Sequence, residues 1–116
     1  MASYELELHE TGTNGVVLVE LSGELDLTAA PELERQLEEA GDRGSALVLD
    51  LNQVSFLDSA ALHVLFRIAR RLEQRKKRFG IVLEPTALVA RTLTIVGLDD
   101  VTVVRPSLDD ILGNSS

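Results

Sequence analysis

The stretch ALVLDLNQVSFLDSAALHVLFRIARRL, residues 46–72, predicts a buried strand, a short loop and a long helix. The strand is indicated by the apolar run over residues 47–51, which is too short for a helix and rich enough in large side chains to be covered on both faces. The spacing of apolar residues then becomes helical. Asp58 or Ser59 can cap this helix, because a short side-chain oxygen accepts a hydrogen bond from a free N–H group of the first turn. A hydroxyl group is therefore expected where the helix begins.

The direction of the Ser59 side chain follows from helix geometry. At about 100° per residue, Ser59 shares one arc with the polar residues that follow it, which are His63, Arg67, Arg70, Arg71 and Gln74. The apolar residues fill an arc from about 140° to about 340°, whereas packing on a core requires a stripe of roughly 100°. Leu62 and Phe66 lie at the edge of this arc beside Ser59, so we expect them to be partly open. We predict a docking surface with a modifiable hydroxyl, made of Ser59, Leu62, His63, Phe66 and Arg70.

The length of 116 residues predicts a single domain, residues 1–116, with a folded core over about residues 4–112. The chain contains no cysteine, which excludes disulfides and thiolate metal ligands. No apolar run reaches the roughly 18 residues of a membrane-spanning helix, and the first residues do not have the basic and apolar segments of a signal peptide. We therefore expect a cytoplasmic protein that does not insert into membranes.

The net charge of −8 argues against general nucleic-acid binding, because such proteins usually present a basic surface. The charge is unevenly distributed. Residues 67–78 contain seven basic side chains and one acidic side chain, Glu73, which gives a local charge of +6. Basic residues in the last turns of a helix oppose the partial negative charge of its carboxyl end, so the run is expected to stabilise the helix and aid solubility. The alternative is contact with an acidic partner.

The remaining chain alternates strand and helix patterns. Residues 4–10 alternate polar and apolar side chains, and Asn14-Gly15 marks a tight turn to a strand over residues 16–21, so these two strands must be antiparallel. Thr28 is the predicted cap of the next helix, which ends at Gly41. The later elements are expected at residues 79–83 (strand), 86–96 (helix), 101–104 (strand) and 107–112 (helix). The order ββαβαβαβα predicts an α/β fold with about four helices and a mixed sheet of about five strands, antiparallel at its start and parallel in its continuation.

Catalytic and metal chemistry find little support in the residue pattern. Asp26, Ser59 and His63 are the residue types of a hydrolytic triad, but no GxSxG turn and no pair of oxyanion donors accompanies them. His9 and His63 fall on different elements, and the carboxylates do not show the spacing of metal ligands. The glycines lie at element boundaries and form no phosphate-binding loop. We predict no catalytic residue, no metal site and no cofactor, with a hydrolase as the least favoured alternative.

Three short motifs carry the most information. They are VSFLDSAAL at residues 54–62, GELD at residues 23–26 with APEL at residues 30–33, and VGLD at residues 96–99. In this order they resemble the STAS-domain family, and within it the bacterial anti-sigma factor antagonists. The resemblance extends from about Val16 to Val104.

The resemblance implies a switch and not a catalyst. In such antagonists, the serine that matches Ser59 is phosphorylated by a partner that is both an anti-sigma factor and a kinase with a histidine-kinase-type ATPase fold. The unmodified antagonist binds this partner and releases a sigma factor, the phosphorylated form dissociates, and a PP2C-type serine phosphatase restores the first state. Asp26 and Asp58 match positions expected at or near the partner-facing surface.

The sequence departs from the family motif directly after the serine. Ala60 and Ala61 stand where the family often has serine or threonine and then glycine. The sequence therefore leaves open a STAS accessory subunit of a transport system that binds proteins without phosphorylation, and it also leaves open a plain capping role for Ser59. A phosphoryl group would add about −1.5 to −2 charges at a helix amino terminus, where N–H groups tolerate them. We therefore expect the fold to survive phosphorylation of Ser59, and docking beside Leu62 and Phe66 to be lost.

Overall fold

The computed structural model describes residues 3–113, which form a five-stranded sheet with four α-helices. The strands are β1 (Tyr4–Glu10), β2 (Val16–Leu25), β3 (Ala46–Leu57), β4 (Arg78–Val82) and β5 (Val103–Arg105). The helices are α1 (Ala30–Asp42), α2 (Ser59–Gln74), α3 (Ala90–Ile95) and α4 (Leu108–Leu112), and a short 3-10 helix, η1 (Leu98–Asp100), follows α3. The sheet order is β1-β2-β3-β4-β5, with β1 and β2 antiparallel and the other pairs parallel. The predicted mixed sheet is confirmed.

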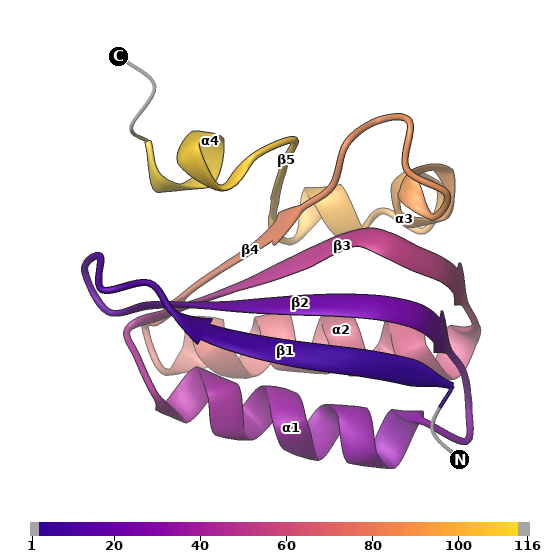
Figure 1. Ribbon diagram of the computed structural model, residues 1–116, viewed down its shortest axis with the longest axis horizontal. Coiled ribbons are helices and arrows are strands. Elements are labelled where there is room, and N and C mark those ends of the chain that lie inside the picture. The colour runs from indigo at the N-terminus through magenta and orange to yellow at the C-terminus, as the bar shows by residue number, and fades with distance from the viewer. Residues whose placement is uncertain (1–2, 114–116) are drawn as a thin grey trace.

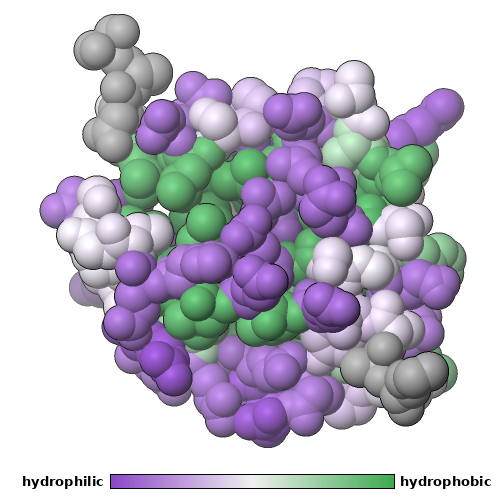
Figure 2. All heavy atoms as spheres, in the orientation of Figure 1, coloured by the Kyte–Doolittle hydropathy of each residue, from purple (hydrophilic) through white to green (hydrophobic). Residues whose placement is uncertain are grey.

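Helices cover the two faces of the sheet unequally. The long helices α1 and α2 lie side by side on one face (Figure 1), and the main core lies between them and the sheet. Its fully buried large side chains are Leu21, Leu25, Leu33, Leu37, Leu47, Leu49, Leu51, Leu65, Ile68, Ile81, Leu93 and Leu98. On the opposite face, α4 packs over a small apolar cluster on β2, β3 and β4. Figure 2 shows hydrophilic side chains over the region of α1 and hydrophobic side chains near α4.

The pairing of β2 with β3 positions the candidate site. The two strands run parallel, with Leu25 opposite Leu57, so the connections that follow them begin side by side. Both strands extend beyond the predicted lengths because the pairing continues through two irregularities near Gly23. Gly23 has a φ of +93°, and a Cβ atom there would lie 2.5 Å from the Ser3 carbonyl oxygen. The glycine of the GELD motif is therefore required by the backbone.

Two predicted helix boundaries are wrong. Thr28 does not cap α1: the N-cap residue is Ala29, without a side-chain hydrogen bond, and Asp26 closes the preceding turn instead. The predicted helix over residues 86–96 is reduced to α3, because residues 85–89 form turns. Leu88, which lies in these turns, is 75% exposed. Within residues 3–113, no helix has both the length and the apolar character needed to span a membrane.

Candidate functional site

Ser59 is the first residue of α2, and its side chain is exposed. Of the two predicted capping residues, Asp58 is the N-cap: its backbone is extended, and its Oδ1 accepts the Ala61 N–H at 3.1 Å. Ser59 therefore does not cap α2. Within residues 3–113, the Ser59 hydroxyl makes no side-chain hydrogen bond, so it is free to react or to bind.

The Asp58 carboxylate also reaches the connection between β2 and α1. Its Oδ2 accepts the Leu27 N–H at 2.8 Å, and the Asp58 N–H donates to the Leu25 carbonyl at 3.1 Å. Asp26 lies in the same connection, where its Oδ1 accepts the Ala29 N–H at 3.0 Å. The structure therefore brings the predicted residues Asp26 and Asp58 together with Ser59 at the carboxyl ends of β2 and β3.

The predicted docking surface on α2 is only partly open. His63 and Arg70 are exposed, and Phe66 is half-buried against the core. The prediction of a partly open Leu62 is wrong, because Leu62 is 9% exposed and belongs to the main core. Phe66 and Arg70 line a shallow groove of about 400 Å³ together with Val101 of the segment after η1. The accessible part of the predicted surface therefore consists of Ser59, His63, Phe66 and Arg70.

Two exposed apolar side chains near Ser59 escaped the sequence interpretation. Leu27, whose N–H is bound to Asp58, is 71% exposed, and Phe56, near the end of β3, is 48% exposed. Phe56 could have been recognised from its place in the loop predicted before the helix, where exposure is expected; the alternation of β3 does not identify it, because the adjacent Ser55 and Phe56 are both exposed. Leu27 carries no comparable signal, because its position depends on a contact with Asp58 across 31 residues.

Three basic residues in and directly after α2 have acidic partners within the chain. Arg67 pairs with Glu34 at 2.7 Å, Arg71 pairs with Glu34 and Glu38, and Arg75 pairs with Asp42 at 2.5 Å. All of these acids lie on α1, and Glu34 is only 19% exposed at its side chain. The hydrogen bonds from Arg67 lower the pKa of Glu34, outweighing burial, which raises it. This part of the +6 run therefore joins two helices and is not free for an external acidic partner.

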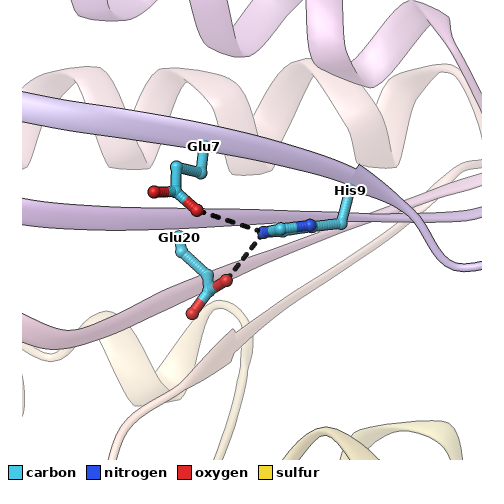
Figure 3. A group of neighbouring side chains, drawn as sticks. All are labelled: Glu7, His9 and Glu20. Atoms are coloured by element: carbon cyan, nitrogen blue, oxygen red, sulfur yellow. Dashed lines mark ion pairs between the residues drawn. The ribbon is translucent and has the colours of Figure 1, made fainter.

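An exposed cluster of titratable side chains lies on the neighbouring strands β1 and β2 (Figure 3). His9 Nε2 is 2.7 Å from a Glu20 carboxylate oxygen and 3.7 Å from a Glu7 carboxylate oxygen. Each of Glu7, His9 and Glu20 has one nitrogen or oxygen atom of the kind that can bind a metal ion, and these three atoms lie within 4.8 Å of one another. Glu7 and His9 are two apart on β1, a spacing visible in the sequence, but Glu20 joins them only through the register that places it opposite Glu7. The sequence interpretation missed this grouping, which forms an exposed ion-paired cluster.

The triad alternative has no geometric support in the described residues. Within residues 3–113, no hydrogen bond joins Ser59 to His63, although they lie one turn apart on α2. The Asp26 Oδ1 atom is engaged by the Ala29 N–H. A general base has to lie within hydrogen-bond reach of its nucleophile. The described residues therefore do not place a general base against Ser59.

Comparison with known proteins decides the family. The sequence model described as the STAS domain matches residues 8–111. This chain belongs to the STAS domain family. This chain is 35% identical over 100 residues to the anti-sigma-F factor antagonist RsfB of Mycobacterium tuberculosis (strain ATCC 25618 / H37Rv). The alignment covers 85% of this chain and 80% of that relative. This chain is 27% identical to the anti-sigma-B factor antagonist of Listeria monocytogenes, with 96% of each chain covered.

A solved structure of an anti-sigma factor antagonist from Mycobacterium paratuberculosis superposes on this STAS domain with a TM-score of 0.82 and 34% identity, covering 97% of this chain and 93% of that one. The unphosphorylated form of the antagonist SpoIIAA superposes with a TM-score of 0.72, covering 95% of each chain, but at 19% identity it shows the fold alone.

The three motifs of this STAS domain serve different purposes. In GELD, Gly23 permits the close approach of Ser3, Leu25 is buried, and Asp26 closes a turn. In VGLD, Gly97 takes a φ of +78° after α3, and Leu98 is fully buried. Both motifs therefore build the fold. The motif around Ser59 differs, because it leaves a hydroxyl exposed and unbonded at the start of a long helix.

Proposed function

We propose that this STAS domain is an anti-sigma factor antagonist, a protein-binding module that is switched by phosphorylation of Ser59. The observation that carries the proposal is the exposed Ser59 hydroxyl, which stands at the first residue of α2 while Asp58 performs the capping. The names of the relatives from Mycobacterium tuberculosis and Listeria monocytogenes support the same role.

The electrostatics of the site favour a switch of binding over a switch of folding. A phosphoryl group on Ser59 adds about −1.5 to −2 charges beside Asp58, at a helix amino terminus where N–H groups and the helix dipole favour negative charge. The fold therefore tolerates the group. A docked partner does not tolerate the phosphoryl group. The dianion would lie next to exposed Leu27 and Phe56, and its water of hydration would have to be removed when the partner binds.

The partners proposed for this switch follow from the family. The unmodified protein binds an anti-sigma factor that is also a serine kinase with a histidine-kinase-type ATPase fold, and this binding releases a sigma factor. The kinase phosphorylates Ser59, the complex separates, and a PP2C-type phosphatase restores the hydroxyl. The protein acts in the cytoplasm as a substrate of these enzymes, without catalytic activity of its own. His63, Phe66 and Arg70 contribute to the partner-facing surface, and Asp26 and Asp58 lie at or near it.

Phosphorylation in vitro tests the proposal. The purified chain is incubated with ATP and an anti-sigma kinase from the same organism, and intact mass and peptide fragmentation are measured. We expect a mass increase of one phosphate on Ser59, none in Ser59→Ala, and an unchanged increase in Ser55→Ala, which removes another exposed serine nearby. A phosphate on a different residue would contradict the proposal. Partner binding without any phosphorylation would favour the transport accessory subunit.

A further inference from the structure

Asp58 joins the two chain segments that meet beside Ser59. Its Oδ1 accepts the Ala61 N–H, which caps α2, and its Oδ2 accepts the Leu27 N–H, 31 residues earlier in the chain. The Asp58 N–H donates to the Leu25 carbonyl, so the two segments are linked by backbone as well. One carboxylate therefore fixes both the start of α2 and the backbone of the turn over residues 26–29.

Leu27 projects from this turn into solvent. It is 71% exposed, although Leu25 and Ala29 on either side are buried. The turn closes through Asp26, whose side-chain and main-chain oxygens both accept the Ala29 N–H at 3.0 Å. Within residues 3–113, the acceptor of the Leu27 N–H is Asp58. A large apolar side chain on a fixed backbone loses little conformational freedom when an apolar pocket of a partner encloses it.

A phosphate on Ser59 would disturb this arrangement directly. It would stand on the residue next to Asp58, and the first turn of α2, residues 59–62, contains no basic side chain. Arg67, Arg71 and Arg75 further along the helix are engaged by α1. The phosphate therefore repels the Asp58 carboxylate and competes with it for N–H groups of the first turn. A displaced carboxylate releases the Leu27 N–H.

We propose that Asp58 is a positioning residue that couples the charge on Ser59 to Leu27. Beside an unmodified hydroxyl, Asp58 holds Leu27 ready for an apolar pocket of the anti-sigma factor, and phosphorylation frees the Leu27 backbone. The choice of partner rests on the proposed function. The coupling between Ser59 and Leu27 does not, because it is a property of the free protein.

Amide hydrogen exchange in the free protein tests the coupling. The samples are wild type, protein with phosphoserine incorporated at position 59 during translation, Asp58→Asn, and Asp109→Asn on the distant α4 as a charge-matched control. Asparagine keeps one oxygen to cap Ala61 but turns an N–H₂ group toward the Leu27 N–H, so it breaks one bond and keeps the other. Asp58→Ser, whose side chain caps α2 but is too short to reach Leu27, serves as a second variant.

We expect the Leu27 amide to exchange roughly tenfold faster or more in the phosphorylated protein, in Asp58→Asn and in Asp58→Ser. The Ala61 amide should stay protected in both Asp58 variants, and Asp109→Asn should match wild type. Unchanged exchange at Leu27 in the phosphorylated protein would overturn the coupling, whether or not any partner binds.

A double-mutant cycle tests whether Asp58 acts through Leu27 or contacts the partner itself. Affinity for the anti-sigma factor is measured by calorimetry for Leu27→Ala, Asp58→Asn and the double variant, with Val103→Ala on the edge strand β5 as an exposed apolar control. We expect about a tenfold loss in each single variant and no further loss in the double variant. Losses that multiply to about a hundredfold would overturn the positioning role. If wild type does not bind, the proposed function fails, and the exchange measurement still decides the coupling.

Discussion

The two ends of α2 differ in how they use polar side chains. At the carboxyl half, Arg67, Arg71 and Arg75 are paired with acids of α1. At the amino end, the carboxylate of Asp58 is doubly hydrogen-bonded, whereas the hydroxyl of Ser59, one residue later, is exposed and unbonded. The most highly charged part of the helix is therefore structural, and the weakly polar hydroxyl is the group left available to a partner. Under the proposed function, charge density alone is therefore a poor guide to the functional end of this helix.

The largest expected effect is on the free energy of unfolding, and it distinguishes buried from exposed apolar residues near the amino end of α2. Leu62→Ala should lower the free energy of unfolding by about 3 kcal/mol, because Leu62 lies in the core. Phe56→Ala, at a half-exposed position, should cost less than half of that and should weaken partner binding instead. Urea denaturation monitored by circular dichroism measures both. Equal stability losses would mean that Phe56 is as important to the core as Leu62.

The next effect concerns Ser59. Ser59→Asp should weaken binding to the cognate anti-sigma kinase by about a hundredfold. The reason is that a second negative charge beside Asp58, placed in an interface, costs several kcal/mol. Ser59→Ala should bind constitutively, and both variants should unfold close to the wild-type temperature. Calorimetric titration and thermal unfolding measure these quantities. Equal affinity of the two variants would remove Ser59 from the switch.

A smaller effect distinguishes the residues of the turn before α1. Asp26→Ala should lower the free energy of unfolding by about 1 kcal/mol, because the Ala29 N–H loses its side-chain acceptor. Thr28→Ala should change it by less than about 0.5 kcal/mol, since Thr28 is exposed and does not cap the helix. Chemical denaturation of the two variants is the measurement. The reverse order would restore Thr28 as the cap.

The smallest effect tests the paired half of α2 and depends on pH. Arg67 lowers the pKa of Glu34 in the folded state, so the contribution of Glu34 to stability is fully present above its unfolded-state pKa of 4.5 and is lost as pH falls through the lowered value. Glu34→Gln should therefore lower the free energy of unfolding by at most about 1 kcal/mol at neutral pH, and the difference from wild type should vanish in acid.

Thermal unfolding over a series of pH values measures this prediction. Glu73→Gln is the matched control, because it removes an exposed carboxylate of α2 that makes no ion pair within residues 3–113. A stability difference between Glu34→Gln and wild type that persists in acid would mean that Glu34 contributes through packing and not through its charge.

The sequence predicts the parts of this molecule that depend on local pattern. The apolar run at residues 47–51 and the Asn14-Gly15 turn yield the central strand and the antiparallel start, because strand burial and turn conformation are set within a few residues. The sequence predicts Asp58 or Ser59 as the cap of α2 for the same reason, and the structure selects Asp58. The element order and the position of Asp58 and Ser59 at the start of α2 could therefore be predicted from the sequence.

The errors arise where a residue depends on distant neighbours. The sequence predicts a partly open Leu62 because a helix on a single sheet needs only a narrow apolar stripe, whereas α2 packs against both the sheet and α1 and so buries a wider one. Leu27 was missed because Asp58, 31 residues away, fixes its backbone. Glu20 joins His9 only through the strand register. Such contacts have no signature in a single sequence.

The exposed glutamates of β1 affect how the protein behaves at high concentration. β1 is an edge strand, so one side of its backbone has N–H and C=O groups available to another strand. Glu5, Glu7 and Glu10 are exposed on this strand. An identical strand from a second molecule would have to bring the same negative charges alongside them. Mutual repulsion therefore protects the sheet from growing by addition of further copies, and a crowded solution should become prone to aggregation when these glutamates are neutralised.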